Sequence, residues 1–87
     1  MEKIKMSDKE IFDRVIKILS PYARNKEALD TANGETNILL DLKVNSSRLV
    51  DIILAFEDDF DIEIADTDAR QVMTIGKAVD MIRTKAA

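Results

Sequence analysis

The sequence predicts an all-α fold, a small bundle of helices, and three observations favour it. The 87-residue chain is 46% apolar but has only two glycines, one proline and 5% aromatic residues, which is more typical of helices than of a sheet with glycine turns. Apolar residues recur at spacings of three and four in three separate stretches. The length predicts one domain over residues 1–87, with a core too small for a deep substrate cavity.

The first predicted helix runs from about residue 8 to residue 20. Ser7 and Glu10 have the spacing of a capping box, in which the two side chains satisfy the first backbone N–H groups of a helix. The apolar stripe that follows consists of Ile11, Val15, Ile18, Leu19 and Tyr22. Pro21 is expected to end the helix.

A long loop is predicted over residues 21–45, because turn-forming residues replace the helical period there. These residues are Asn25, Asp30, Thr31, Asn33 and Gly34. A loop of this length in a small domain is expected to fold against the core or to serve function. The apolar residues expected to hold its second half on the bundle are Ile38, Leu39, Leu40, Leu42 and Val44.

Three more helices are predicted, which completes a four-helix bundle with a short third helix. Helix two covers residues 46–60, with Asn45 or Ser46 as its N-cap. Its apolar stripe consists of Leu49, Ile52, Ile53, Phe56 and Phe60. Helix three is expected over residues 66–72, and Thr74 is expected to cap helix four. The stripe of helix four consists of Ile75, Ala78, Val79 and Ile82.

The net charge of −4 is unevenly distributed along the chain. Residues 41–70 carry nine acidic and three basic residues, a net charge of −6, whereas the remainder carries eight acidic and ten basic residues. An acidic middle repels nucleic acid and anionic membranes and attracts basic protein surfaces. An acidic face that is merely solvated is the alternative.

Self-contained catalysis is not expected, because the chain has neither cysteine nor histidine. A disulfide, a thiolate metal site and a cysteine nucleophile are excluded, and the commonest general base is missing. The acidic residues from Asp59 onward do not form an EF-hand, since Ile64 and Arg70 stand where that loop needs Gly and Glu. No specific metal site is predicted, although weak binding of a divalent ion to the clustered acids stays open.

A cytoplasmic location is expected. The longest apolar runs, such as residues 52–56, are far too short to span a membrane, so no stable membrane insertion is predicted. Residues 1–6 alternate charged and apolar side chains instead of leading into the apolar region of a signal peptide.

Helix two is also predicted to expose an apolar pair. At about 100° per residue, Val50 and Leu54 fall roughly 120° from the centre of the core stripe. The polar and acidic residues that surround the pair are Ser47, Asp51, Glu57 and Asp58. This pattern predicts a docking site for a partner with an apolar pocket flanked by Lys or Arg. Packing of the pair against a neighbouring helix or the long loop is the alternative.

Two consecutive segments carry a resemblance to a known family. Residues 41–60 read DLKVNSSRLVDIILAFEDDF, and residues 61–82 read DIEIADTDARQVMTIGKAVDMI. Together they resemble the acyl carrier proteins, whose pattern is roughly D-L-G-x-D-S-L, then an acidic apolar helix ending in E-E-F, then D-I-E-I-P-D. The matching residues are Asp41, Leu42, Ser46, Glu57, Asp58, Asp59, Phe60, Asp61, Ile62, Glu63, Ile64 and Asp66.

The resemblance implies that Ser46 carries the cofactor of this family. A phosphopantetheinyl transferase would attach 4′-phosphopantetheine from coenzyme A to Ser46, and the terminal thiol would hold an acyl group as a thioester. The reactive sulfur would then come from the cofactor, which suits a chain without cysteine. Backbone N–H groups at a helix N-terminus also favour a phosphodiester there. A plain N-cap serine is the alternative for Ser46.

Four departures from the family pattern point to a specialised carrier. Lys43, Asn45, Ser47 and Arg48 stand where the family usually has glycine, aspartate, leucine and an acidic or small residue. The resemblance implies that Ser47 removes an apolar partner contact and that Arg48 adds a positive charge at the docking face. Arg48 is also placed to pair with Asp51 or Asp59.

The resemblance further implies the partners of a monomeric carrier. These are the transferase and the enzymes of fatty-acid, lipid or polyketide-type synthesis that load or receive the acyl group. An aminoacyl or peptidyl carrier and an unmodified helical interaction module remain as alternatives.

Overall fold

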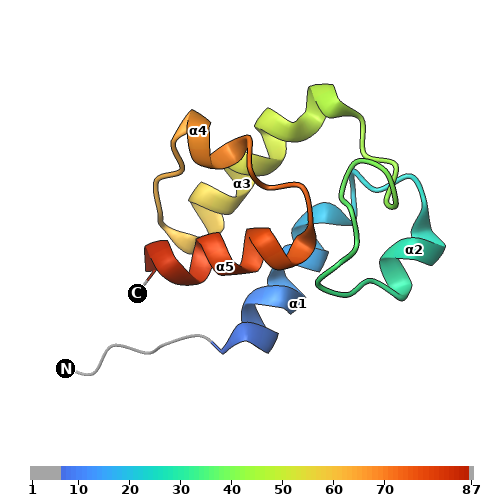
Figure 1. Ribbon diagram of the computed structural model, residues 1–87, viewed down its shortest axis with the longest axis horizontal. Helices are drawn as coiled ribbons and strands as arrows, with labels where there is room; N and C mark the ends of the chain where they lie inside the picture. The colour runs from blue at the N-terminus through green and yellow to red at the C-terminus, as the bar shows by residue number, and fades with distance from the viewer. Residues whose placement is uncertain (1–6, 87) are drawn as a thin grey trace.

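The computed structural model describes residues 7–86, so that residues 1–6, where the sequence predicts no signal peptide, lie outside the described part. Within it the chain forms a bundle of helices, and Figure 1 shows their arrangement. The elements are α1 (Asp8–Leu19), α2 (Lys26–Asp30), the 3₁₀ turn η1 (Ser46–Arg48), α3 (Leu49–Phe60), α4 (Asp66–Ala69) and α5 (Ile75–Ala86). The predicted all-α fold is therefore confirmed.

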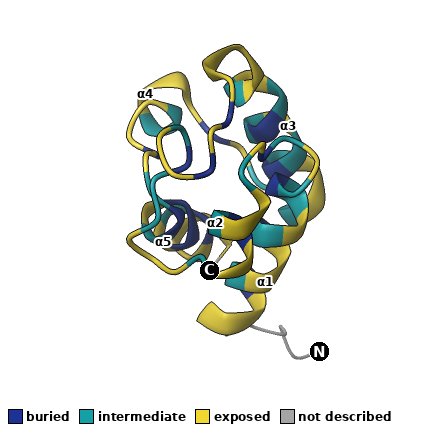
Figure 2. Ribbon diagram, turned by 90° about the vertical axis from the view of Figure 1, so that its right-hand side faces the viewer, coloured by how far each residue is buried: buried dark blue, intermediate teal, exposed yellow. Residues whose placement is uncertain are grey.

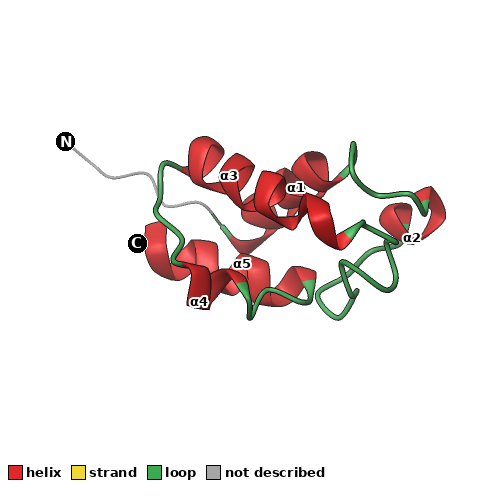
Figure 3. Cartoon of the chain, turned by 90° about the horizontal axis from the view of Figure 1, so that it is seen from above, coloured by secondary structure: helices red, strands yellow, loops and turns green. Residues whose placement is uncertain are grey.

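The core lies between the three long helices, since α1 packs against both α3 and α5. Figure 3 shows these helices from above, and Figure 2 shows that their buried faces turn toward one another. The core residues of the long helices are Ile11, Val15, Leu19, Ile52, Phe56, Ile75, Ala78, Val79 and Ile82. Burying a large apolar side chain stabilises the fold by about 1.5–3 kcal/mol, so these stripes fix how each helix is rotated.

The first helix begins and ends close to the predicted residues. Ser7 Oγ accepts a hydrogen bond from Glu10 N at 3.2 Å, and Glu10 Oε1 accepts one from Ser7 N at 2.9 Å. The predicted capping box is thus confirmed. The helix ends at Leu19, with Ser20 as its C-cap and Pro21 directly after it. Tyr22, predicted to continue the stripe, lies beyond the helix and is half-buried.

The long connection contains a helix that the sequence did not predict. Asn25 Oδ1 accepts a hydrogen bond from Ala28 N at 3.1 Å and so caps α2, whose Leu29 is buried. With five residues, α2 is too short to show a helical period or to be stable alone. Backbone bonds from Arg24 N and Asn25 N to Leu42 O, each of 3.0 Å, hold its first end against the second half of the loop.

The second half of the loop packs on the bundle through three of the five expected residues. Ile38, Leu42 and Val44 are buried, and Leu39 is half-buried. The prediction is wrong for Leu40, whose side chain is 74% exposed. The segment turns there, because Asn37 Oδ1 accepts a hydrogen bond from Leu40 N at 2.8 Å and Asn37 O accepts one from Asp41 N at 2.9 Å. The other apolar side chains face the core, and Leu40 faces solvent.

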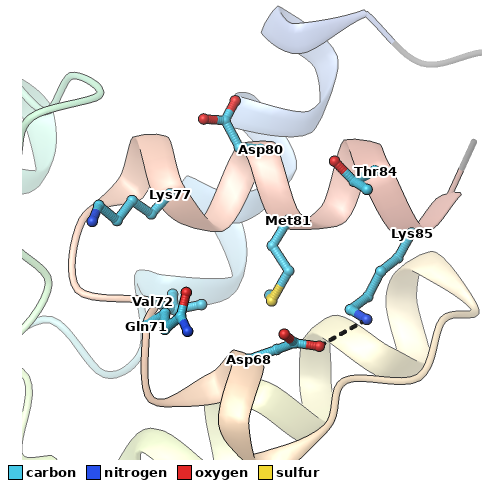
Figure 4. A pocket seen from close by; sticks show the side chains of 8 residues that line it. All are labelled: Asp68, Gln71, Val72, Lys77, Asp80, Met81, Thr84 and Lys85. Carbon is cyan, nitrogen blue, oxygen red and sulfur yellow. Dashed lines mark ion pairs between the residues drawn. The ribbon is translucent and has the colours of Figure 1, made fainter.

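The predicted helix over residues 46–60 is α3 preceded by η1, and it ends as predicted at Phe60. Asp61 takes the left-handed conformation, with φ of 54°, which ends the helix. The third helix is shorter than predicted, because α4 ends at Ala69 and turns follow it. An ion pair between Asp68 and Lys85, 2.9 Å long, ties α4 to α5 (Figure 4).

The start of α5 is held against the long loop by close backbone contact. Thr74 Oγ1 accepts a hydrogen bond from Lys77 N at 3.2 Å, which confirms Thr74 as the cap. Gly76 N donates to Gly34 O at 2.8 Å, and Ile75 N donates to Thr36 O at 3.1 Å. A Cβ atom on Gly76 would lie only 2.7 Å from Gly34 O, whereas one on Gly34 would lie 3.7 Å from Gly76 Cα. Of the two glycines, only Gly76 occupies a position where a larger side chain would not fit.

Gly76→Ala is expected to lower the free energy of unfolding by about 1–3 kcal/mol, because the added methyl group must push backbone away. Alanine in a helix is otherwise better than glycine by about 0.5–1 kcal/mol, so the expected sign is the reverse of the ordinary one. Gly34→Ala is the matched control and should change little. Urea unfolding of both variants is the measurement, and a Gly76→Ala variant more stable than wild type would contradict the packing described.

Candidate functional site

The start of α3 is organised by the side chain of Asn45. Its Oδ1 accepts hydrogen bonds from both N and Oγ of Ser47, each at 3.0 Å. Its backbone O accepts a third from Arg48 N at 2.8 Å. Of the two N-caps that the sequence left open, the structure therefore has Asn45.

Ser46 therefore does not cap the helix. It is exposed, and its hydroxyl makes no hydrogen bond to any other residue within 7–86, whereas the Ser47 hydroxyl is bound to Asn45. The expectation that N–H groups at this helix start could hold an anion is wrong for Ser47 and Arg48, because Asn45 already binds both. The structure thus gives Ser46, the serine that the resemblance indicates, different surroundings from those of the adjacent Ser47.

Arg48 pairs with the first of its two predicted partners. Its Nη1 lies 3.2 Å from Asp51 Oδ2, one helical turn away, and both side chains are largely exposed, so the pair is worth about 0–1 kcal/mol. The alternative prediction, that Arg48 pairs with Asp59, is wrong. Asp59 lies at the far end of α3 and pairs with Arg14 of α1 at 2.8 Å, while the Arg14 guanidinium lies 5.0 Å from the centroid of the Phe60 ring.

The predicted apolar pair of α3 is on the surface. Val50 is 67% exposed and Leu54 55% exposed, whereas Ile52 and Phe56 are buried. This excludes the alternative that the pair packs into the fold; that a partner docks on it stays a prediction. We call Val50, Leu54 and the neighbouring Ser47, Asp51 and Asp58 the α3 face.

Glu57 has a role in the fold that the sequence did not predict. Its Oε2 accepts a hydrogen bond from Ile64 N at 2.7 Å, and its side chain is half-buried. Glu57 therefore holds the segment after α3 onto the helix. That Glu57 also belongs to the rim around Val50 and Leu54 stays a prediction. Only Oε1 of its carboxylate is not used in the bond to Ile64.

A hollow that includes Asn45 and Arg48, the residues on either side of the two serines, also includes residues that the sequence analysis did not single out as part of a site. It has a volume of about 260 Å³ and is lined by Pro21, Tyr22, Arg24, Asn45 and Arg48. Pro21, Tyr22 and Arg24 follow α1 and are brought to the start of α3 by the fold. No local pattern could have indicated this long-range contact.

A second hollow, between α4 and α5, is shown in Figure 4. It has a volume of about 350 Å³ and is lined by Asp68, Gln71, Val72, Lys77, Asp80, Met81, Thr84 and Lys85. Half of these residues are charged, and none is a sequence neighbour of Ser46, so we assign it no part in the site. Within residues 7–86 there is no group of three or more carboxylates placed to hold a metal ion, and no helix long and apolar enough to cross a membrane.

Comparison with known proteins identifies the family. No family model matches the chain. An acyl carrier protein from a Picosynechococcus strain is 36% identical over 78 residues, which cover 90% of this chain and 94% of that protein. An acyl carrier protein from Lactobacillus acidophilus is 38% identical over 80 residues, which cover 91% and 96%. This chain belongs to the acyl carrier protein family.

The carrier fold is shared with a solved structure as well. The acyl carrier protein from Enterococcus faecalis, described for its high thermal stability, superposes with a TM-score of 0.76 at 34% identity, covering 92% of this chain and 99% of that one. The resemblance seen in residues 41–82 is thus confirmed over most of the chain. Acyl carrier proteins carry groups for other enzymes and are not themselves catalysts, so this carrier is not an enzyme.

Truncating a side chain on the buried side of α3 should cost far more stability than truncating one on its exposed side. Ile52→Ala is expected to lower the free energy of unfolding by about 2–5 kcal/mol, because Ile52 is 1% exposed and leaves a cavity. Leu54→Ala should change it by about 0.5 kcal/mol or less, because that side chain already meets water. Thermal and urea unfolding of both variants measure the difference. A Leu54→Ala variant as unstable as Ile52→Ala would contradict the exposed α3 face.

Proposed function

We propose that this carrier holds an acyl group as a thioester on 4′-phosphopantetheine attached to Ser46 and presents it to synthesis enzymes. The observation that carries the proposal is the contrast between two adjacent hydroxyls. Ser46 Oγ is exposed and without a hydrogen-bond partner among residues 7–86, whereas Ser47 Oγ donates to Asn45. An attacking oxygen must be reachable by another enzyme, and Ser46 meets that condition better.

The attachment step uses coenzyme A as the donor and needs a second protein. Ser46 Oγ attacks the phosphorus atom that bears the pantetheine, the P–O bond to the adenosine half breaks, and adenosine 3′,5′-bisphosphate leaves. The hydroxyl proton must pass to a base of the transferase, because the chain has no histidine and no carboxylate bonds to Ser46 among residues 7–86. Once attached, the cofactor supplies the thiol that the chain itself lacks.

The α3 face is the proposed docking surface for the enzymes that load and receive the acyl group. Val50 and Leu54 offer an exposed apolar anchor, and Asp51 and Asp58 supply negative charge beside it. An apolar pocket flanked by Lys or Arg is the complementary partner surface, since the anchor gives affinity and the charges speed association. Because Ser46 lies at the start of the same helix, docking there brings the arm to the partner.

Incubation with coenzyme A and a broad-specificity transferase should add the mass of one phosphopantetheine to the wild-type protein. Ser46→Ala should abolish the mass increase, and Ser47→Ala, the matched control, should keep it. Intact-mass spectrometry is the measurement. If Ser46→Ala is still modified and Ser47→Ala is not, the assignment to Ser46 is wrong, and if wild type takes up nothing, the chain is an unmodified interaction module.

The double variant Ser47→Leu and Arg48→Glu should associate faster with a basic fatty-acid synthesis enzyme, by about tenfold at low salt. The first change extends the apolar anchor, and the second removes a positive charge that a basic partner would meet beside the α3 face. Stopped-flow association is the measurement, with high salt as the control that should reduce the gain. Equal rates would show that these two residues do not set partner choice.

A further inference from the structure

The start of α3 leaves a phosphate on Ser46 with fewer backbone donors than a helix N-terminus ordinarily offers. Asn45 already accepts the hydrogen bonds of Ser47 N and Arg48 N, and Ser46 O accepts that of Leu49 N. The surroundings of Ser46 therefore have to supply the charge for an anion in another way. The hollow lined by Asn45 and Arg48, which flank Ser46 and Ser47 in the chain, can do so, because two of its five lining residues are arginines.

Arg24 reaches this hollow from the connection after α1. Its backbone N donates a hydrogen bond to Leu42 O at 3.0 Å. This bond holds the segment after α1 against the loop that leads into η1 and α3. Its side chain is exposed, and its guanidinium forms no ion pair or hydrogen bond with any residue within 7–86. An arginine that is positioned but not neutralised keeps all five N–H donors for a ligand.

Arg48 is the second arginine in the lining of the hollow. Its Nη1 binds Asp51 Oδ2 at 3.2 Å, and no other hydrogen bond within residues 7–86 uses its remaining donors. One planar guanidinium group can donate two parallel hydrogen bonds to a phosphate, a geometry that the ammonium group of lysine does not offer. Asn45, which directly precedes Ser46 in the chain, also lines the hollow.

We infer that Arg24 and Arg48 form an anion-binding hollow that holds the phosphodiester of the prosthetic group on Ser46. The inference rests on the proposed function and adds a positioning site to it. With the phosphate held there, the root of the arm lies toward Tyr22 and the end of α1, away from Val50 and Leu54. The α3 face then stays open for a partner while the arm is attached.

A thermodynamic cycle on the complete chain tests this inference. Apo and holo forms of wild type, Arg24→Gln and the matched control Arg70→Gln are prepared, and intact mass confirms loading. Arg70 is an exposed arginine at the end of α4, outside the hollow. The rise in thermal midpoint from apo to holo should be smaller in Arg24→Gln than in wild type by about 2–5 °C at low salt, and it should be unchanged in Arg70→Gln.

The arginine side chains give a second and more local readout. In ¹H–¹⁵N spectra the Nε–H signals of Arg24 and Arg48 should move between apo and holo protein, and that of Arg70 should not. Loading without movement at Arg24, or an equal rise in midpoint for both variants, would overturn the anion-binding hollow and leave the proposed function intact. A wild-type protein that takes up no phosphopantetheine would overturn the proposed function, and this inference with it.

Discussion

The burial of Ile52 and Phe56 is the constraint on which the site depends. Both side chains are essentially inaccessible to water, so α3 has one permitted rotation about its axis. With that rotation fixed, Val50 and Leu54 must face solvent, because they lie on another side of the same helix. One helix of twelve residues thereby provides both a wall of the core and the exposed apolar pair of the proposed docking surface.

The long connection between α1 and α3 completes the site by bringing distant residues to the start of α3. Ile38, Leu42 and Val44 anchor its second half in the core, and backbone bonds to Leu42 fix its first half. The result places Arg24 and Asn45 in the lining of one hollow at the start of α3. A connection of this length was expected to fold against the core or to serve function, and its contacts make it part of the scaffold.

Much of the fold could be predicted from the sequence, because three amphipathic helices repeat their apolar residues long enough to show the period. The capping box at Ser7 and the cap at Thr74 were also readable, since caps depend on neighbouring residues alone. The helix α2 was missed because five residues cannot show a period. Leu40 was wrongly placed in the core because its exposure depends on a turn made by Asn37.

The site was predictable to a similar extent and for the same physical reason. The α3 face followed from helical geometry, which is local. The choice of Ser46 over Ser47 followed from the resemblance alone, whereas the hydrogen bond of the Ser47 hydroxyl to Asn45 could be seen only in the structure. The hollow with Arg24 could not be predicted at all, since it joins residues separated by a whole loop.

The cap by Asn45 is proposed to leave Ser46, and not Ser47, as the residue that carries the prosthetic group. Fragmentation mass spectrometry of the loaded wild-type protein tests it most directly, because backbone cleavage between the two serines separates their masses without any substitution. The whole added mass is expected on the fragments that contain Ser46, and none is expected on Ser47. Phosphopantetheine found on Ser47 in the wild-type chain would contradict it.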